Sequence, residues 1–368
     1  MRRLRKVIAS ILCVLGVLTG DLTVPAAGAG TAVPGRWGFA FVNTPNGVPT
    51  LARQAGSWPP GPVVSTLTPA GGPTYVRFPR LATTGGVAHV TAVSPRPEWC
   101  QALWWGPSDA DLLVAVRCHR YGGAPVAVPF AVLFEESVPP VEGPVEDTDG
   151  RAFGYVHHDG AAVVSRFNSA AGENTVTAGP PGTWDVLMSG LGSARRAGGL
   201  QVTAVDPERP VRCKVAAWTS TAAGQSVRVR CHDAADTPVG TGWTLTYQRE
   251  RAITGAALPS ENFAYTFDNL PDDAGPYLPR PGGVSHNSHG AVNTVRSAGA
   301  GLRLVTFPQV GGRLDHMQVT AYGPGPEYCN LPAPWNTGAL AVTVRGVACY
   351  NGLVRAAQAF MVTYASAG

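Results

Sequence analysis

The chain repeats one pattern three times, and this repeat limits the folds that are open to it. A strand-like segment that reads Val-Thr-Ala, followed by Val or Tyr, occurs at 90–93, 202–205 and 319–322. In each copy a cysteine, a tryptophan and a second cysteine follow in that order. The copies are spaced by about 110 residues, and a unit of that length can build its own hydrophobic core. The sequence therefore predicts an array of small domains rather than one large catalytic fold.

Each copy also predicts the same set of strands. An aromatic–small–aromatic triplet opens every copy, at 37–39, 153–155 and 263–265, and a further strand is expected at 75–78, 184–187 and 302–305. The chain has 45 glycines and 33 prolines among 368 residues, yet 45% of its residues are hydrophobic, which favours short strands joined by many turns. With roughly seven or eight strands per copy and no helical periodicity, we expect an all-β protein. It should contain three tandem β-sandwich units, immunoglobulin-like or related, at 36–137, 150–249 and 261–366, which we call repeats 1, 2 and 3.

Two cysteines in each repeat predict one disulfide per repeat. The pairs are Cys100 with Cys118, Cys213 with Cys231, and Cys329 with Cys349. Six cysteines allow fifteen pairings, and the repetition selects the pairing within each repeat because every domain must meet the bond geometry locally. Closing a loop of about 18 residues stabilises each repeat by ~3 kcal/mol through lost chain entropy. The third pair is two residues further apart, and we place one extra residue in a β-bulge near Gly346.

Residues 1–29 have the features of a secretory signal peptide. Arginines and a lysine at 2, 3, 5 and 6 precede an apolar run from Val7 to Leu18, and small residues end the segment at 27–29. The run is shorter than the ~20 residues that cross a bilayer as a helix, so we expect a secreted protein with no membrane insertion after cleavage. Both the general and the twin-arginine export routes stay open. Cleavage leaves 24 basic and 23 acidic residues, a balance that argues against nucleic acid or an anionic membrane as the partner.

No constellation of reactive residues stands out above the repeat. His157, His158 and Asp159 form the densest titratable cluster, and a metal or acid–base role is open to it. Neighbouring residues of a strand face opposite sides, so the polar start of a loop is the preferred interpretation. His286 and His289 are interpreted in the same way, as part of a surface hairpin. We expect no enzyme, no metal and no cofactor, and a hydrolase that uses these histidines is the less favoured alternative.

The tryptophans that the repeat does not explain are the candidates for ligand binding. Six of the nine tryptophans occupy positions shared by the repeats and are expected in the core. The other three are Trp58, Trp99 and Trp104, all in repeat 1. Exposed rings beside a disulfide-braced loop could stack on sugar rings or anchor a protein partner. Packing of these rings against proline-rich loops is the simpler alternative and the preferred interpretation.

The assembled repeat resembles one found in exported proteins of actinobacteria and other bacteria. The motifs that carry the resemblance are an aromatic-Gly-aromatic start, an Asn-Thr-Val strand, Val-Thr-Ala-Val, Cys-x4-Trp, Val-x-Val-x-Cys and a final Phe-x-Val-x-Tyr. The resemblance implies no established activity and therefore no catalytic residues. We expect a secreted, non-catalytic array that binds an extracellular or cell-surface partner, such as a glycan, a wall component or a protein. A structural spacer at the cell exterior is the alternative, and the oligomeric state stays open.

Overall fold

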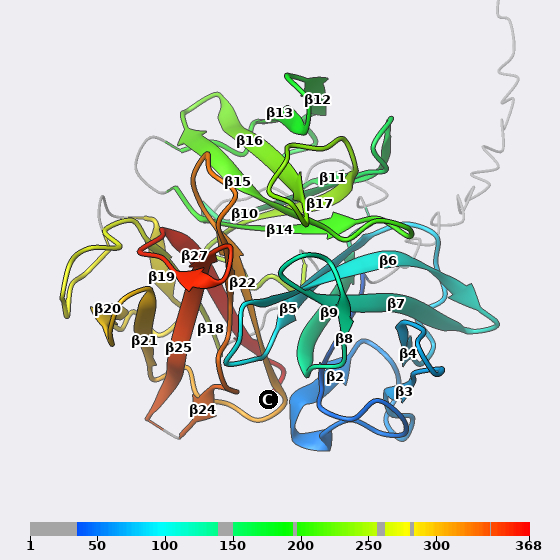
Figure 1. Ribbon diagram of the computed structural model, residues 1–368. Coiled ribbons are helices and arrows are strands. Elements are labelled where there is room, and N and C mark those ends of the chain that lie inside the picture. The colour runs from blue at the N-terminus through cyan, green and yellow to red at the C-terminus, as the bar shows by residue number, and fades with distance from the viewer. Residues whose placement is uncertain (1–34, 139–149, 194–196, 256–261, 280–282, 339) are drawn as a thin grey trace, which may run out of the picture. The chain divides into compact units, whose positions relative to one another are not determined.

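The computed structural model describes residues 35–138, 150–193, 197–255, 262–279, 283–338 and 340–368. In these residues the protein has 27 strands and one turn of 3-10 helix, η1 (Leu51–Arg53), which confirms the all-β prediction. The described residues form one compact unit (Figure 1). The predicted signal peptide at 1–29 lies outside the described residues. Within the described ranges, no helix is long and apolar enough to cross a membrane.

Repeat 1 consists of two antiparallel sheets that face each other across a core. One sheet has the strand order β2-β1-β9-β5, and the other contains β6-β7-β4-β3 with β8 beside β7. Valine and phenylalanine side chains such as Val76, Phe78 and Phe134 fill the space between the sheets. The strands are β1 (Arg36–Val42), β2 (Gln54–Gly56), β3 (Ser65–Leu67), β4 (Thr74–Phe78), β5 (Val87–Ala92), β6 (Glu98–Ser108), β7 (Asp111–Arg120), β8 (Pro125–Val126) and β9 (Phe130–Glu136).

Repeats 2 and 3 build the same pair of sheets. Repeat 2 has the orders β11-β10-β17-β14 and β12-β13-β16-β15, and repeat 3 has β19-β18-β27-β22 and β20-β21-β25-β23. A parallel pairing of β14 with β6, at Val205 and Ala102, joins the first sheet of repeat 2 to the second sheet of repeat 1. The strands of repeat 2 are β10 (Ala152–His158), β11 (Val163–Asn168), β12 (Asn174–Ala178), β13 (Thr183–Ser189), β14 (Gly199–Val205), β15 (Val211–Ser220), β16 (Gly224–Asp233) and β17 (Gly242–Arg249). Those of repeat 3 are β18 (Asn262–Asp268), β19 (Ser285–Asn287), β20 (Thr294–Ser297), β21 (Leu302–Pro308), β22 (Asp315–Ala321), β23 (Tyr328–Asn330), β24 (Asn336–Thr337), β25 (Ala341–Asn351), β26 (Val354–Arg355) and β27 (Phe360–Ser366).

One disulfide joins two neighbouring strands in each repeat. The bonds are Cys100–Cys118, Cys213–Cys231 and Cys329–Cys349, the pairs that the repeat predicts. In every case the two cysteines are directly opposite each other in an antiparallel pair. The bulge expected near Gly346 is also present. Val344 and Val347 of β25 pair with Val305 and Arg303 of β21, so two residues of β25 lie opposite one residue of β21.

The three repeats join in a cycle and not in a row. The residue that follows each of the segments 90–93, 202–205 and 319–322 donates a backbone hydrogen bond to another repeat. The acceptor lies two residues after the first cysteine of that repeat. The backbone N–H groups donate as follows: Asp206 to Ala102 O at 3.1 Å, Gly323 to Val215 O at 2.9 Å, and Ser94 to Leu331 O at 2.7 Å. Repeat 2 thus contacts repeat 1, repeat 3 contacts repeat 2, and repeat 1 contacts repeat 3. Three equivalent contacts that close in this way define a pseudo-threefold axis, and β5, β14 and β22 lie near the centre of Figure 1.

The aromatic–small–aromatic triplets fill the interfaces between repeats. Each triplet lies on the first strand of a repeat and packs against the Val-Thr-Ala strand of the repeat before it in the cycle. The equivalent contacts are Val87 with Phe153 and Tyr155, Gly199 with Tyr265, and His316 with Phe39. These rings therefore hold the cycle together, in addition to starting each sandwich.

Polar side chains are also buried between the repeats, close to the axis. The ring nitrogens of His89 lie 3.2 Å from Thr203 Oγ1 and 2.7 Å from Thr246 Oγ1, which joins repeat 1 to repeat 2. Thr91 donates to Gln318 Oε1 at 2.7 Å, which joins repeat 1 to repeat 3. Buried polar groups require partners, so these bonds fix the relative position of the strands that meet there.

Candidate functional site

Trp99 lies at the pseudo-threefold axis, which corrects the expectation of an exposed ring. Its side chain is only 4% exposed, and its Nε1 donates to Val211 O at 3.1 Å. The equivalent residues in the other repeats are Arg212 and Tyr328, each directly before a first cysteine. The Arg212 guanidinium lies 5.0 Å from the Trp99 ring and 4.9 Å from the Tyr328 ring, so cation–π contacts close the axis. Trp99 is buried because it joins repeats and is therefore not available to a ligand.

A cavity of about 50 Å³ lies on the axis. It is lined by the three Val-Thr-Ala segments, by the first cysteine of each disulfide, and by Lys214 and Glu327. Such a volume holds one or two water molecules and no metabolite. Lys214 Nζ lies 2.9 Å from Glu327 Oε2 and also donates to Glu327 O at 3.1 Å. Burial outweighs the attraction of Glu327 and lowers the pKa of Lys214 to about 8.

A buried lysine with a lowered pKa is typical of a catalytic amine, but Lys214 has a structural counterpart in each of the other repeats. Gln101 and Asn330 also follow a first cysteine, and both reach into the turn of the next repeat. Gln101 Nε2 donates to Asp206 O at 2.7 Å, and Asn330 Nδ2 donates to Glu98 O at 3.0 Å. We therefore interpret Lys214 as a clamp between repeats.

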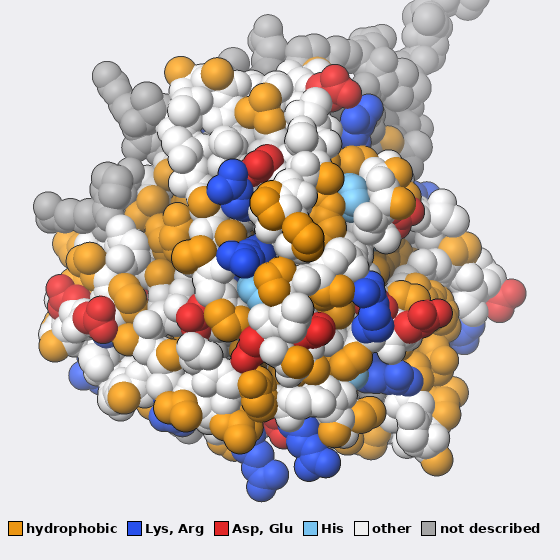
Figure 2. Space-filling view, turned by 45° about the horizontal axis from the view of Figure 1, so that its top comes forward, with side chains coloured by type: hydrophobic (Ala, Val, Ile, Leu, Met, Phe, Trp, Pro, Cys, Tyr) orange, Lys and Arg blue, Asp and Glu red, His pale blue; other side chains and the backbone are white. Residues whose placement is uncertain are grey.

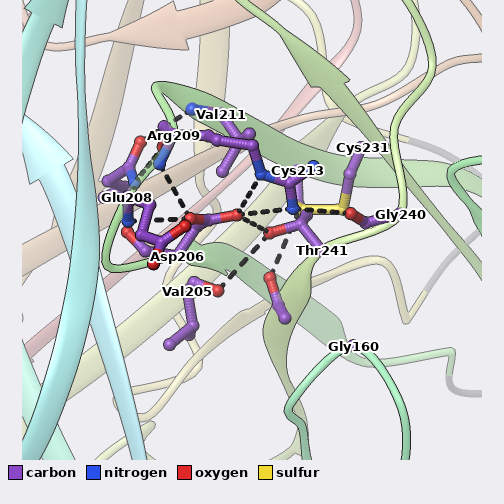
Figure 3. A network of polar contacts seen from close by, with 12 residues as sticks. Gly160, Val205, Asp206, Glu208, Arg209, Val211, Cys213, Cys231, Gly240 and Thr241 are labelled. Atoms are coloured by element: carbon purple, nitrogen blue, oxygen red, sulfur yellow. Dashed lines mark hydrogen bonds and ion pairs between the residues drawn. A yellow bond between two sulfur atoms is a disulfide. The ribbon is translucent and has the colours of Figure 1, made fainter.

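The turn that Gln101 holds is stabilised by the network in Figure 3. The Asp206 carboxylate accepts hydrogen bonds from the backbone N–H of Arg209 at 2.8 Å, from the Arg209 guanidinium at 2.7 Å and from Thr241 Oγ1 at 2.9 Å. Burial favours the neutral acid, but these hydrogen bonds outweigh it and lower the pKa of Asp206. The network gives the turn a fixed shape, and its function is structural.

The histidine cluster does not converge on one point. The ring of His157 lies 4.3 Å from that of Trp105 in repeat 1, whereas the ring of His158 stacks on Trp243 at 5.2 Å. Asp159 accepts two hydrogen bonds from the backbone of its own turn, both at 2.8 Å. Burial lowers the pKa of His157 to about 4, so this ring is neutral at pH 7. Among the residues with described positions, no group of three His, Cys, Asp or Glu side chains can hold a metal ion.

The second pair of histidines is also separated. His286 stacks against Phe263 at 5.3 Å and against Tyr265 at 5.6 Å, both on the neighbouring strand β18 of the same repeat. His289 Nε2 lies 2.7 Å from Asn262 Oδ1. The two rings therefore have different partners, and neither arrangement provides a nucleophile with its base.

Trp58 is a half-buried core residue and not part of an exposed platform, which corrects a second expectation. Its ring lies directly over Gly56, where a Cβ atom would be 1.8 Å from a ring carbon. It also packs against Phe78 with ring centroids 6.2 Å apart, at the hydrophobic core of repeat 1. Trp58 therefore stabilises the sandwich, and it cannot share a ligand with Trp104 on the outer side.

Trp104 is the one predicted binding residue that reaches the surface. It is 41% exposed. The pairing of β6 with β7 contains a bulge between Ala102 and Trp104. The bulge reverses the alternation of sides, so Trp105 packs toward the core while Trp104 points outward. The exposed ring is thus a consequence of the local strand geometry.

Trp104 belongs to a row of apolar side chains across the outer face of this sheet. The strand register pairs Leu67 with Tyr75, Tyr75 with Ala115, and Ala115 with Trp104. Directly paired residues project from the same face of a sheet, so the four residues form one strip, which we call the aromatic row. The Tyr75 and Trp104 rings are 6.1 Å apart, and Leu67 at the far end is 60% exposed.

The same face becomes polar next to the aromatic row. Arg77, two residues after Tyr75, places its Nε 3.1 Å from Asp111 Oδ2 and its Nη2 3.4 Å from Ser108 Oγ. An open hollow of about 550 Å³ is lined in part by Arg77, Arg80 and Asp111. Exposed rings and charged hydrogen-bonding groups therefore lie side by side.

The aromatic row occurs in repeat 1 alone. At the equivalent positions repeat 2 has Thr177, Asp185, Arg228 and Ala217. There Arg228 and Asp185 form an exposed ion pair at 2.8 Å. In repeat 3 Arg296 pairs with Leu304, and a proline precedes Trp335. The shared scaffold does not require the rings of repeat 1, so they are the best candidates for a specific function.

The molecular surface in Figure 2 mixes basic, acidic and hydrophobic side chains, with no broad area of one charge on the face shown. No protein-family model, curated protein or solved structure matches the sequence. Function must therefore be inferred from the site itself. Sequence reasoning identified Trp104 because no other repeat explains it, but it missed Tyr75, Leu67 and Arg77, which strand register places beside it.

Proposed function

We propose that the protein is a secreted, non-catalytic binding protein, and that the aromatic row of repeat 1 binds a saccharide chain at the cell exterior, such as a wall glycan. The observation that carries this proposal is the pair of neighbouring, solvent-accessible rings of Tyr75 and Trp104. Sugar rings present C–H groups on one face, which pack on aromatic rings, and hydroxyls at their edge, which hydrogen-bond to polar side chains. Tyr and Trp suit such partly solvated surfaces, because each combines an apolar ring with one hydrogen-bonding group.

The dimensions of the aromatic row also support this class of ligand. The row crosses four neighbouring strands, so it spans about 14 Å, the length of roughly two or three hexose units. Arg77 and Asp111 lie beside the row, where they can donate to and accept from hydroxyl groups. An exposed row beside an open polar hollow favours an extended chain of sugars, which can follow the tilt of 52° between the Tyr75 and Trp104 rings, over a deeply enclosed metabolite.

The covalent chemistry and the signal-peptide features of the sequence support the proposed extracellular location. Disulfides form and persist in oxidising compartments, and this chain has three. The signal-peptide features at 1–29 favour the same location, and the near balance of charge leaves no strong electrostatic attraction to compete with ring stacking.

Retention on insoluble polysaccharides tests the proposal. Cellulose, chitin and peptidoglycan are each incubated with the protein, and the bound fraction is measured after washing. We expect retention on at least one of them and a loss of about tenfold or more in affinity for Trp104→Ala and for Tyr75→Ala, since a central aromatic anchor is worth ~2 kcal/mol. Leu187→Ala is the matched control, because Leu187 is 44% exposed on a strand of repeat 2.

Two results would refute the proposal. Equal retention of both ring variants and the wild type would remove the aromatic row from the binding site. If the correctly folded wild type is retained by none of the polysaccharides, glycan binding is wrong and a structural role at the cell exterior is favoured.

A further inference from the structure

At one end of each sandwich, three positions correspond among the repeats by strand register. The repeats have different side chains at these positions. Strand register makes Val42, His158 and Asp268 equivalent, because each pairs with the aromatic residue near the start of the last strand. Those aromatic residues are Phe130, Trp243 and Phe360. The third position, two residues before a buried valine, holds Thr74, Trp184 and Arg303.

Repeat 2 closes this end with three rings. The His158 ring stacks on Trp243 at 5.2 Å, and Trp184 packs against Trp243 at 5.9 Å. Both tryptophans are buried. Stacked rings of this kind leave little space for a guest between the sheets.

Repeat 3 closes the same end with a buried ion pair. Arg303 Nε donates to Asp268 Oδ2 at 2.8 Å, and the side chains are 4% and 0% exposed. The Tyr277 hydroxyl also donates to Asp268. Repeats 2 and 3 thus fill this end of the sandwich with large or charged side chains, whereas repeat 1 has Val42 and Thr74 at the corresponding positions.

Repeat 1 has Val42, Thr74 and Phe130 at these positions, and a cavity of about 400 Å³ lies there. Its lining is mainly apolar and includes Val116 and Val126. The rim is braced, since Thr68 Oγ1 lies 2.9 Å from Thr74 Oγ1 and donates to Pro45 O at 2.8 Å. These bonds connect three of the segments that line the cavity.

We propose that this cavity is a second binding site of repeat 1, which takes a small, flat, apolar ring compound in place of the missing side chains. Its volume falls in the range of small-molecule sites, and apolar cavities accept apolar guests. The aromatic rings that fill the equivalent space in repeat 2 indicate which shape fits. Arg117 is the one charged residue of the lining, and strand alternation places it on the outward side of β7, while Val116 and Cys118 face inward. An uncharged ring is therefore favoured over a carboxylate.

The site is independent of the proposed glycan site. Thr74 and Val76 face the inside of the sandwich, whereas Tyr75 between them belongs to the aromatic row on the outside. Binding or its absence at one site therefore leaves the proposal for the other site unaffected.

Indole is the probe for the test. We expect wild-type protein to bind one indole per chain, with a dissociation constant on the order of 0.1–1 mM by calorimetry. Thr74→Trp, which copies Trp184 of repeat 2, should abolish binding, while Tyr75→Ala on the outer face should leave it unchanged. The converse change, Trp184→Thr, should raise the stoichiometry to two.

A direct measurement keeps the proposal falsifiable if a variant fails to fold. In methyl NMR spectra of the wild type, indole should shift the signals of Val42, Val116 and Val126 and leave those of Val186 and Val305 unchanged. Absence of binding by the wild type, undiminished binding by folded Thr74→Trp, or shifts confined to other valines would each overturn the proposal.

Discussion

Replacement of Lys214 by glutamine should change how the stability of the protein depends on pH. Lys214 is buried against Glu327, with its side chain 4% exposed. Burial, the largest effect, lowers its pKa from the ordinary value of 10.5 to about 8 despite the attraction of Glu327. Glutamine is a conservative replacement, because Gln101 occupies the equivalent position in repeat 1 and makes the same kind of contact to the next repeat.

The sign and size of the effect follow from linkage. Below pH 8 Lys214 is protonated in both the folded and the unfolded protein, and the full cost of burying the ammonium is present. Between pH 8 and 10.5 the unfolded protein binds a proton that the folded protein does not, so the free energy of unfolding rises with pH. A fall in pKa from 10.5 to about 8 corresponds to ~3 kcal/mol, since each pKa unit is worth about 1.36 kcal/mol.

Urea denaturation of the wild type and Lys214→Gln from pH 6.5 to 10.5 measures this effect. The stability of the wild type relative to the variant should be constant below pH 7 and should then increase by up to ~3 kcal/mol. Arg228→Gln, a change at an exposed residue of repeat 2, is the control and should give a flat difference. Lys6 and Lys214 are the only lysines in the chain, so NMR of lysine-labelled protein reports the Lys214 midpoint directly. A difference that is flat or falls with pH, or a midpoint near 10.5, would refute the reasoning.

Two further substitutions test the packing described above. Gly56→Ala should destabilise the protein by ~1–3 kcal/mol in urea denaturation, because the new Cβ overlaps the Trp58 ring, and Trp58→Leu in the same chain should restore part of the loss; an unchanged midpoint would show that Trp58 does not lie over Gly56. Asp268→Asn should cost ~3–5 kcal/mol, because it leaves Arg303 buried without its carboxylate. The same substitution in the exposed ion pair of repeat 2, Asp185→Asn, should cost less than ~1 kcal/mol, and equal losses for the two variants would contradict the buried pair.

Features that depend on residues close in sequence or repeated in register were predictable. The disulfides follow from the repetition of the cysteine pairs, and the bulge near Gly346 follows from a break in the alternation of valines. Trp104 could be selected because no other repeat has a ring there. Each of these inferences needs only the local strand period or the comparison of one repeat with another.

The partners across strands were not predictable, because they depend on register. Aligning the strand segments by sequence sets Tyr75 opposite Trp184, whereas the structure makes Tyr75 equivalent to Asp185. A displacement of one residue exchanges the inner and outer faces of a strand, so the sequence alignment hid Tyr75 as a neighbour of Trp104.

The position of Trp99 between the repeats was not predictable for a different reason. Its counterpart in repeat 3, Tyr328, is also aromatic, but the counterpart in repeat 2 is Arg212, which carries a charge. A position that alternates between rings and a cation is typical of a surface, and only the cycle of repeats turns it into an interface. The sequence of a tandem repeat does not show whether its last repeat packs against its first.

The contact between repeat 3 and repeat 1 has a consequence for how the sequences of the three repeats can diverge. Three identical subunits around an axis must change together, since one gene would encode every copy, and they separate on dilution. In this protein the three repeats belong to one chain, and Thr91 of repeat 1 hydrogen-bonds to Gln318 of repeat 3, 227 residues further along. Two repeats can therefore keep the ion pair and the stacked rings that stabilise the scaffold, while repeat 1 carries different side chains at the same positions. The assembly does not separate on dilution.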